Sequence, residues 1–100
     1  PTDVNETNLT ALPADYGLGQ NYPNPFNPTT SIGFDLPKAG QVRLEVFNLL
    51  GQSVKVLAEG RYAAGSHQVM FSADNLPSGI YFYRLSHDGG SATRKMILLK

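Results

Sequence analysis

Residues 41–48 read Gln-Val-Arg-Leu-Glu-Val-Phe-Asn, and they carry the clearest alternation in the chain. Valine and leucine at every second position alternate with the charged residues Arg43 and Glu45. A period of two is typical of a strand that has one buried face and one solvated face. This stretch therefore predicts a half-buried strand, and with it a β-sheet architecture.

Short segments with the same character lie on both sides of it, separated by glycine and proline. The segments predicted to be strands are residues 31–36, 41–48, 53–59, 68–72, 80–86 and 91–99, with a further short one around 17–22. Turn sequences between them recur at intervals of roughly 8–12 residues, and no segment shows the stripe of an amphipathic helix. The pattern predicts an all-β fold, an immunoglobulin-like antiparallel β-sandwich of about seven short strands.

The segment ahead of the first long strand is rich in proline and asparagine. Residues 21–30 read Asn-Tyr-Pro-Asn-Pro-Phe-Asn-Pro-Thr-Thr. Each proline fixes φ, removes a backbone donor and favours an extended conformation in the residue before it. Asparagine favours turns because its side chain can bond to nearby backbone groups. We expect a rigid, extended, turning entry into the sheet, here called the leader.

The chain divides into two parts by composition. Residues 1–16 are polar and lack periodicity, which predicts a linker from an upstream domain, and residues 17–100 form the predicted sandwich. Asn5 and Asn8 match the glycosylation pattern Asn-x-Ser/Thr, but this short pattern is common by chance. Because the chain begins at Pro1 without an initiator methionine or a signal peptide, we expect it to be part of a longer protein.

Charge and composition argue against two classes of partner. The chain has 100 residues, with eight basic and eight acidic residues and no net charge, whereas nucleic-acid binding needs a surplus of cations. No apolar run approaches the roughly 20 residues of a membrane-spanning helix. The chain has no cysteine, and this leaves the compartment open.

Catalytic and metal-binding patterns are not found in the sequence. His67 and His87 lack the spacing of a zinc site, so they are interpreted as surface histidines. Asp88-Gly89 could suggest a calcium loop, but a hairpin turn explains it fully. There is no nucleophile-elbow motif and no phosphate-binding glycine loop. The sequence therefore predicts no enzyme activity, no cofactor and no metal.

The aromatic residues of segment 80–86 allow two interpretations. Tyr81, Tyr83 and Leu85 share one face of the predicted strand, and outward-pointing rings could form a sugar-binding platform. The favoured interpretation places this face in the core, because a central sandwich strand buries one whole face. Phe47 and Phe82 are then the aromatics expected to be exposed.

Several motifs together resemble one known family. They are Leu18-Gly19-Gln20 followed by the leader, Gly51-Gln52, Ala64-Gly65 with His67, Leu76-Pro77-Ser78-Gly79-Ile80-Tyr81, and Thr93-Arg94-Lys95-Met96-Ile97-Leu98-Leu99-Lys100. This set resembles the type A C-terminal sorting domain of the type IX secretion system over residues 17–100. It is also similar to the immunoglobulin-like domain of the flagellar hook-capping family. Where relatives often place tryptophan, this chain has Phe71.

The resemblance implies a function in protein export from Bacteroidetes-type bacteria. It implies an upstream cargo domain in the same chain, passage through the periplasm, and recognition by the outer-membrane translocon. It also implies removal of the domain by a sortase-like cysteine protease near the linker, with the cargo released or held at the outer-membrane surface.

We hypothesise that residues 91–100 and 79–85 form the surface that the translocon recognises, because a C-terminal strand at a sheet edge can pair with another protein's strand. The alternative is that these segments are only core strands, with two lysines as solubilising residues. The residues concerned are Gly79, Tyr81, Leu85, Arg94, Lys95, Met96, Ile97, Leu98, Leu99 and Lys100. The leader is assigned a structural role through Asn21, Tyr22, Pro23, Asn24, Pro25, Phe26, Asn27 and Pro28.

Other classes of function stay open at this stage. A carbohydrate-binding or spacer module attached to a secreted hydrolase is the second hypothesis, and a small enzyme is the third. A sandwich fold does not separate them, because the same architecture supports many functions. A planar row of exposed aromatic rings would favour the carbohydrate-binding module.

Overall fold

The structure is a computed structural model that describes residues 12–100. Most of the predicted linker, residues 1–16, lies outside this range, and so do both matches to the glycosylation pattern.

Seven strands make up the described part of the chain, and no helix occurs in it. The strands are β2 (Gly17–Leu18), β3 (Thr29–Leu36), β4 (Gly40–Phe47), β5 (Ser53–Tyr62), β6 (Gly65–Ser72), β7 (Gly79–His87) and β8 (Gly90–Leu98). The predicted all-β class is confirmed. Three boundaries were wrong by three residues or more. β5 continues past residue 59 and β6 begins before residue 68, because Gly60 and Gly65 pair in register with Val42 and Leu36. The short segment predicted at 17–22 is a strand only at its first two residues.

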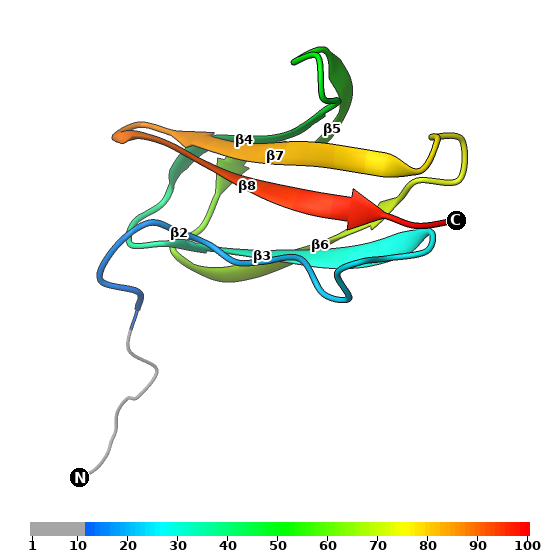
Figure 1. Cartoon of the computed structure of the whole chain (residues 1–100). Helices are drawn as coiled ribbons and strands as arrows, with labels where there is room; N and C mark the ends of the chain where they lie inside the picture. The colour runs from blue at the N-terminus through cyan, green and yellow to red at the C-terminus, as the bar shows by residue number, and fades with distance from the viewer. Residues whose placement is uncertain (1–11) are drawn as a thin grey trace, which may run out of the picture.

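The strands form two antiparallel sheets that face each other (Figure 1). One sheet has the order β2-β3-β6 and the other has the order β5-β4-β7-β8. This is an immunoglobulin-like arrangement. The fourth strand in chain order, β5, pairs with the third, β4, in the larger sheet instead of joining the smaller sheet. The order leaves β8, the last strand of the chain, at one edge of the larger sheet.

The core lies between the two sheets and takes every second residue of the long strands. The buried apolar side chains are those of Leu18, Phe26, Ile32, Phe34, Leu36, Val42, Leu44, Val46, Ala58, Phe71, Ala73, Tyr81, Tyr83, Leu85, Met96 and Leu98. The predicted core positions of Tyr81, Tyr83 and Leu85 are thus confirmed. A sugar-binding platform on this face is excluded, because the rings point into the sandwich.

The expectation that Phe47 and Phe82 are the exposed aromatics was wrong. The two rings are half-buried because they occupy paired positions on β4 and β7, and the guanidinium carbon of Arg84 lies 4.6 Å from the centre of the Phe47 ring. The largely exposed aromatic ring among residues 12–100 is Tyr22, at 80% of its full accessibility. It lies in the leader, where no neighbouring strand covers it.

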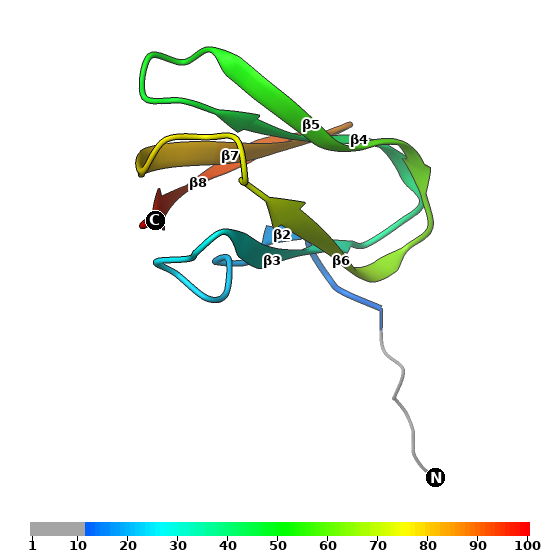
Figure 2. The ribbon, with the colours of Figure 1, turned by 90° about the vertical axis from the view of Figure 1, so that its right-hand side faces the viewer.

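A tight turn at residues 48–52 joins β4 to β5. The Asn48 side-chain oxygen accepts hydrogen bonds from the backbone N–H groups of Leu50 and Gln52, at 2.9 and 3.0 Å. Gly51 has φ of 82°, a conformation that favours glycine. Two register shifts between β4 and β5 precede this turn. The end of the hairpin projects away from the sandwich (Figure 2).

Candidate recognition surface at the C-terminal edge

The predicted recognition residues 94–100 lie along β8 or directly after it, at a sheet edge, whereas Gly79, Tyr81 and Leu85 lie on the neighbouring strand β7. The N–H of Ile97 donates to the side-chain oxygen of Asn24 at 3.0 Å, and its C=O accepts from the N–H of Phe26 at 2.9 Å. Both backbone groups of Ile97 therefore point away from β7. Because the two backbone groups of every second residue in an antiparallel strand face the same side, those of Lys95 and Thr93 also point away from β7.

The leader covers the last part of this edge. Phe26 forms a parallel bridge with Leu98, and its C=O accepts from the N–H of Leu99 at 3.0 Å. In Figures 1 and 2 the leader loop lies beside the C-terminal end of β8. The leader thus binds by its backbone to the far end of the chain.

The leader is also fixed to the smaller sheet. Tyr22 and Ser31 exchange two backbone hydrogen bonds, each of 2.9 Å. The side-chain amide of Asn21, which is buried, donates to Thr30 at 3.0 Å and to the Pro23 C=O at 3.1 Å. The leader therefore joins β3 of one sheet to β8 of the other and closes one side of the sandwich. The sequence predicted a stiff entry but did not show that it contacts β8.

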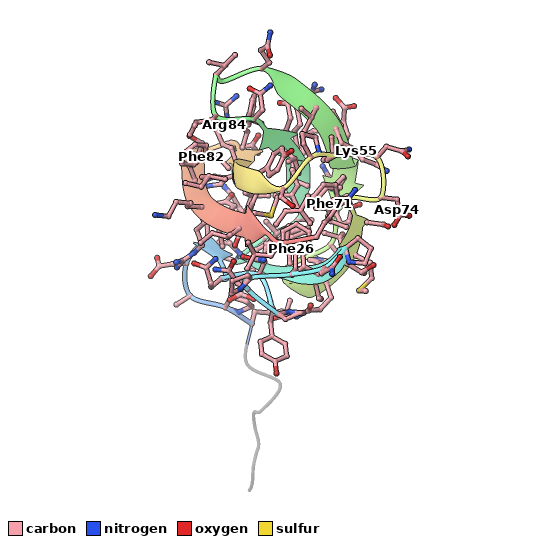
Figure 3. The ribbon with its side chains drawn as sticks, turned by 45° about the vertical axis from the view of Figure 1, so that its right-hand side comes forward. Phe26, Lys55, Phe71, Asp74, Phe82 and Arg84 are labelled. Carbon is pink, nitrogen blue, oxygen red and sulfur yellow. The ribbon has the colours of Figure 1, made fainter. Side chains whose placement is uncertain are left out.

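Phe26 anchors the leader in the core. Its ring is 2% exposed and lies 6.0 Å from the Phe71 ring, between centroids. Figure 3 shows Phe26 and Phe71 between the layers. A single apolar ring within a run of proline and asparagine is a sequence signal for such an anchor.

Tyr83 of β7 makes a second connection to the start of the leader. Its hydroxyl donates to the C=O of Gly19 at 2.7 Å and accepts from the N–H of Asn21 at 2.8 Å. Burial raises the pKa of the Tyr83 phenol, against the opposing effects of the Asn21 hydrogen bond and the charge of Arg94. The phenol therefore keeps its proton at neutral pH and stays available as the donor to Gly19.

The predicted recognition residues divide into two groups in the structure. Tyr81, Leu85, Met96 and Leu98 have their side chains in the core, so a partner of the folded domain cannot contact them. Arg94, Lys95, Leu99 and Lys100 are exposed, and Ile97 is half-buried. Gly79 is exposed and has φ of 152°. This backbone conformation favours glycine, so the residue type is explained without any contact to a partner. The structure brings the second group together along β8 and at its end.

Two of the exposed cations also fasten the strand. Arg94 donates from Nε to the C=O of Leu18, which links β8 to β2 of the opposite sheet. Lys100 donates from its backbone to the Ser78 hydroxyl at 2.9 Å and from Nζ to the Asp74 C=O at 2.5 Å. Lys95 is the cation of β8 whose ammonium group makes no ion pair or hydrogen bond with residues 12–100.

The outer face of the larger sheet carries charges of both signs on β4 and β5. Arg43 contacts Glu45 at 3.1 Å and Glu59 at 2.5 Å, and hydrogen bonds from Arg43 and then from Ser53 lower the pKa of Glu45. The hydrogen bonds of Arg43 to Glu45 and then to Glu59 raise the pKa of Arg43. Figure 3 shows Phe82 and Arg84 on the outward side of this sheet. β7 and β8 thus carry cations without acidic residues, whereas β4 and β5 carry charges of both signs.

The two histidines are partly covered by aromatic stacking. The His67 ring stacks on Phe34 with centroids 5.2 Å apart, and its Nε2 lies 2.8 Å from the Ala63 C=O. The His87 ring stacks on Tyr16 at 3.6 Å. They are thus half-buried packing residues, not freely exposed ones. Within residues 12–100 no three histidine or acidic side chains come together in a group that could hold a metal ion.

A shallow polar hollow lies on the outer face of the smaller sheet. It encloses about 460 Å³, and its lining includes Tyr22, Asp35 and Gln68. Tyr22 contributes a single exposed ring, so the described residues form no planar row of aromatics. Residues 12–100 include no helix of the length and apolarity needed to cross a membrane.

Fold and edge define a small immunoglobulin-like β-sandwich that presents its last strand at a sheet edge. A family model described as "Secretion system C-terminal sorting domain" matches residues 20–99. The chain belongs to this family, the C-terminal sorting domains of the type IX secretion system. No curated protein and no solved structure shows a significant match. The family implies a sorting signal, typically without catalytic activity, for export to the cell surface or the medium.

Proposed function

We propose that the outer-membrane translocon of the type IX system recognises this domain in its folded form, through the exposed part of β8 and the residues that follow it. The supporting observation is that the last strand lies at a sheet edge and carries two exposed cations, Arg94 and Lys95. A strand in that position offers backbone groups and charge at once, and both are available without unfolding.

The proposal extends to the other parts of the export route. An upstream cargo domain in the same chain crosses the periplasm with this domain attached. A sortase-like cysteine protease then cuts within the linker, residues 1–16, and the cargo is released or held at the outer-membrane surface. Cleavage in the linker leaves the sandwich intact, because the linker precedes β2.

A reporter fusion in a bacterium that has the type IX system tests the proposal. A folded periplasmic reporter, fused ahead of the complete 100-residue chain, is expected in the medium or at the cell surface. Retention in the periplasm with the domain folded and intact would overturn the proposal. Deleting residues 93–100 would not test recognition separately from folding. Met96 and Leu98 belong to the core, so we expect their loss to unfold the domain.

The linker cleavage has its own measurement. The carboxyl end of the exported reporter, determined by mass spectrometry, is expected to fall within residues 1–16. Exported reporter that still carries residues 17–100 would contradict removal by a protease and leave recognition of the sandwich standing.

The carbohydrate-binding module remains the second candidate, supported by one observation. The hollow beside Tyr22 combines an exposed ring with the amide of Gln68 and the carboxylate of Asp35, groups that can bind sugar hydroxyls. Titration with soluble polysaccharides, comparing the chain with Tyr22→Ala, tests this candidate. Binding that is lost in the variant would favour it, and equal behaviour of the two proteins would exclude this hollow as a sugar site.

A further inference from the structure

We propose that the uncovered half of the β8 edge, residues 90–95, binds an extended acidic segment of the partner as an added strand. This inference rests on the proposed function, which identifies the partner as part of the export machinery. Residues 90–95 would contribute their outward backbone N–H and C=O groups, and the partner segment would contribute acidic side chains.

Most outward hydrogen-bonding groups of this stretch have no partner among residues 12–100. The leader bonds to Ile97 and Leu99, and the Gln20 side chain donates to the Lys95 C=O at 2.8 Å. Within residues 12–100 nothing bonds to the outward N–H and C=O of Thr93 or to the N–H of Lys95. These groups repeat at the spacing of a β-ladder, so an extended backbone is the ligand they fit.

The stretch 90–95 is also sterically accessible. Every residue from Gly90 to Lys95 is exposed, whereas the following residues of β8 alternate between buried and half-buried. Residues 20–30 bond to the edge only from Lys95 onward, and ahead of Lys95 the bond to a neighbouring segment is the one from the Arg94 side chain to the Leu18 C=O. An added strand of about five residues could lie against 90–95 without displacing the leader, since a strand of that length is ordinary in sheets.

The charges around this edge favour an acidic partner. β7 and β8 together carry Arg84, Arg94 and Lys95 and no acidic residue. The carboxylate of Glu45, on the next strand, already bonds to Arg43 and Ser53. A partner strand on this edge would place its side chains beside Lys95, so acidic residues are favoured and basic ones are disfavoured.

Charge and register together separate β8 from two of the other edges. β5, at the opposite edge of the same sheet, carries Glu59 together with Lys55 and Arg61 and is shifted in register at two places, which weakens regular pairing, and β6 carries no lysine or arginine. A second copy of this chain is disfavoured on the β8 edge, because two such edges would bring like charges together. The favoured occupant is therefore a different, acidic chain.

The sharpest test removes one outward N–H. Thr93→Pro deletes the backbone donor on the exposed side of the edge, a position where proline is tolerated because that N–H bonds to no other group. Thr93→Val is the matched control, since it alters the side chain and keeps the N–H. Circular dichroism and urea unfolding of both variants establish that the sandwich is retained.

Export of the reporter and binding of a defined probe are then compared. The probe is a synthetic eight-residue peptide of alternating valine and aspartate, and its charge-reversed counterpart contains lysine in place of aspartate. We expect the acidic peptide to slow amide hydrogen exchange at Thr93 and Lys95 and to bind about tenfold more weakly to Thr93→Pro than to Thr93→Val. Equal protection by the lysine peptide, or equal binding to both variants, would overturn the proposal.

Lys95→Glu keeps the proposal testable if the proline variant fails to fold. This exposed substitution leaves the backbone unchanged and is expected to reverse the preference between the two peptides. An unchanged preference would contradict the charge argument. Self-association of the chain through this edge, detected as a dimer that Thr93→Pro abolishes, would also overturn the assignment to an acidic partner.

The failure of this inference is distinguishable from failure of the proposed function. If Thr93→Pro and Lys95→Glu export the reporter as well as the unchanged chain does, the edge is not the docking site, while the domain remains a sorting signal. If the unchanged chain exports nothing from a competent host, the proposed function itself is wrong.

Discussion

The two halves of β8 belong to one continuous strand but differ in what lies beside them. From residue 96 onward the side chains of Met96 and Leu98 are in the core, and the leader bonds to the outer backbone. From residue 90 to 95 every residue is exposed, and the Gln20 side chain bonds only to the final carbonyl of this stretch, that of Lys95. The part of β8 from residue 96 onward therefore closes the sandwich, whereas the edge of residues 90–95 is left open.

This difference shows how one strand can serve stability and recognition without conflict. Exposed sheet edges are sites of unwanted pairing, and proteins protect them with prolines, charges or covering loops. Here the leader protects the half that holds the core, and Arg94 and Lys95 protect the half that is open. A charged edge still admits a partner of the opposite charge, so selective access follows from the same residues that prevent aggregation.

The largest expected effect comes from removing the anchor of the covered half. Phe26→Ala should lower the free energy of unfolding by about 3–5 kcal/mol, because it opens a cavity between the two sheets beside Phe71. Urea denaturation measures it. Tyr22→Ala, four residues earlier and exposed, is the control and should change stability by less than about 0.5 kcal/mol. A loss below about 1 kcal/mol for Phe26→Ala would mean that the leader is not fixed by this ring.

The next effect tests the connection between β7 and the leader. Tyr83→Phe removes the hydroxyl that bonds to Gly19 and Asn21, and should cost about 1–3 kcal/mol because buried backbone groups lose their partner. Tyr81→Phe is the matched control. Its hydroxyl makes one bond, to the Pro77 C=O, so the loss should be about 0.5–1.5 kcal/mol. Equal losses in chemical denaturation would contradict a special connection at Tyr83.

A smaller effect separates the two halves directly. Asn24→Ala removes the acceptor for the Ile97 N–H, and should cost about 0.5–1.5 kcal/mol. Hydrogen exchange followed by NMR should be faster at the Ile97 amide and unchanged at the Thr93 amide, which has no such acceptor. If both amides respond alike, the two halves behave as one unit and the comparison fails.

The smallest effect concerns pH. Hydrogen bonds from Arg43 and Ser53 hold the pKa of Glu45 below its ordinary value of 4.5. A carboxyl group whose pKa is lower in the folded state stabilises the fold above the unfolded pKa, and that contribution is lost as pH falls through the folded pKa. In Glu45→Gln the unfolding midpoint should therefore decline less steeply below about pH 4.5. The faster hydrogen exchange of the Ile97 amide in Asn24→Ala should be the same with and without this substitution. Parallel pH profiles for both proteins would contradict this assignment.

Much of the fold could be predicted because its signal is local. Alternation in residues 41–48 and 80–86 set which side chains are buried, and Asn48 with Gly51 set a turn. Strand ends were harder to predict, since Gly60 and Gly65 interrupt the apolar pattern but still pair within the sheet. Propensity read along one strand does not include the partner strand that keeps such a glycine in register.

The candidate surface was predicted only in outline. Segment 91–100 was identified, but its residues were treated as one group. Their division into buried Met96 and Leu98 and exposed Lys95 depends on the opposite sheet, which is distant in sequence. The exposure expected for Phe47 and Phe82 failed for a similar reason, because their rings pair across strands with Arg84 beside them.

The sequence by itself determined the all-β class, the turns, the core faces of the long strands, and the stiff proline-rich leader. These follow from residue periodicity and backbone preference, which act between near neighbours. Only the tertiary structure decided that the leader binds to the last strand, and hence which half of the edge stays open. That pairing joins Asn24 to Ile97 across 73 residues, through hydrogen bonds that no local pattern records.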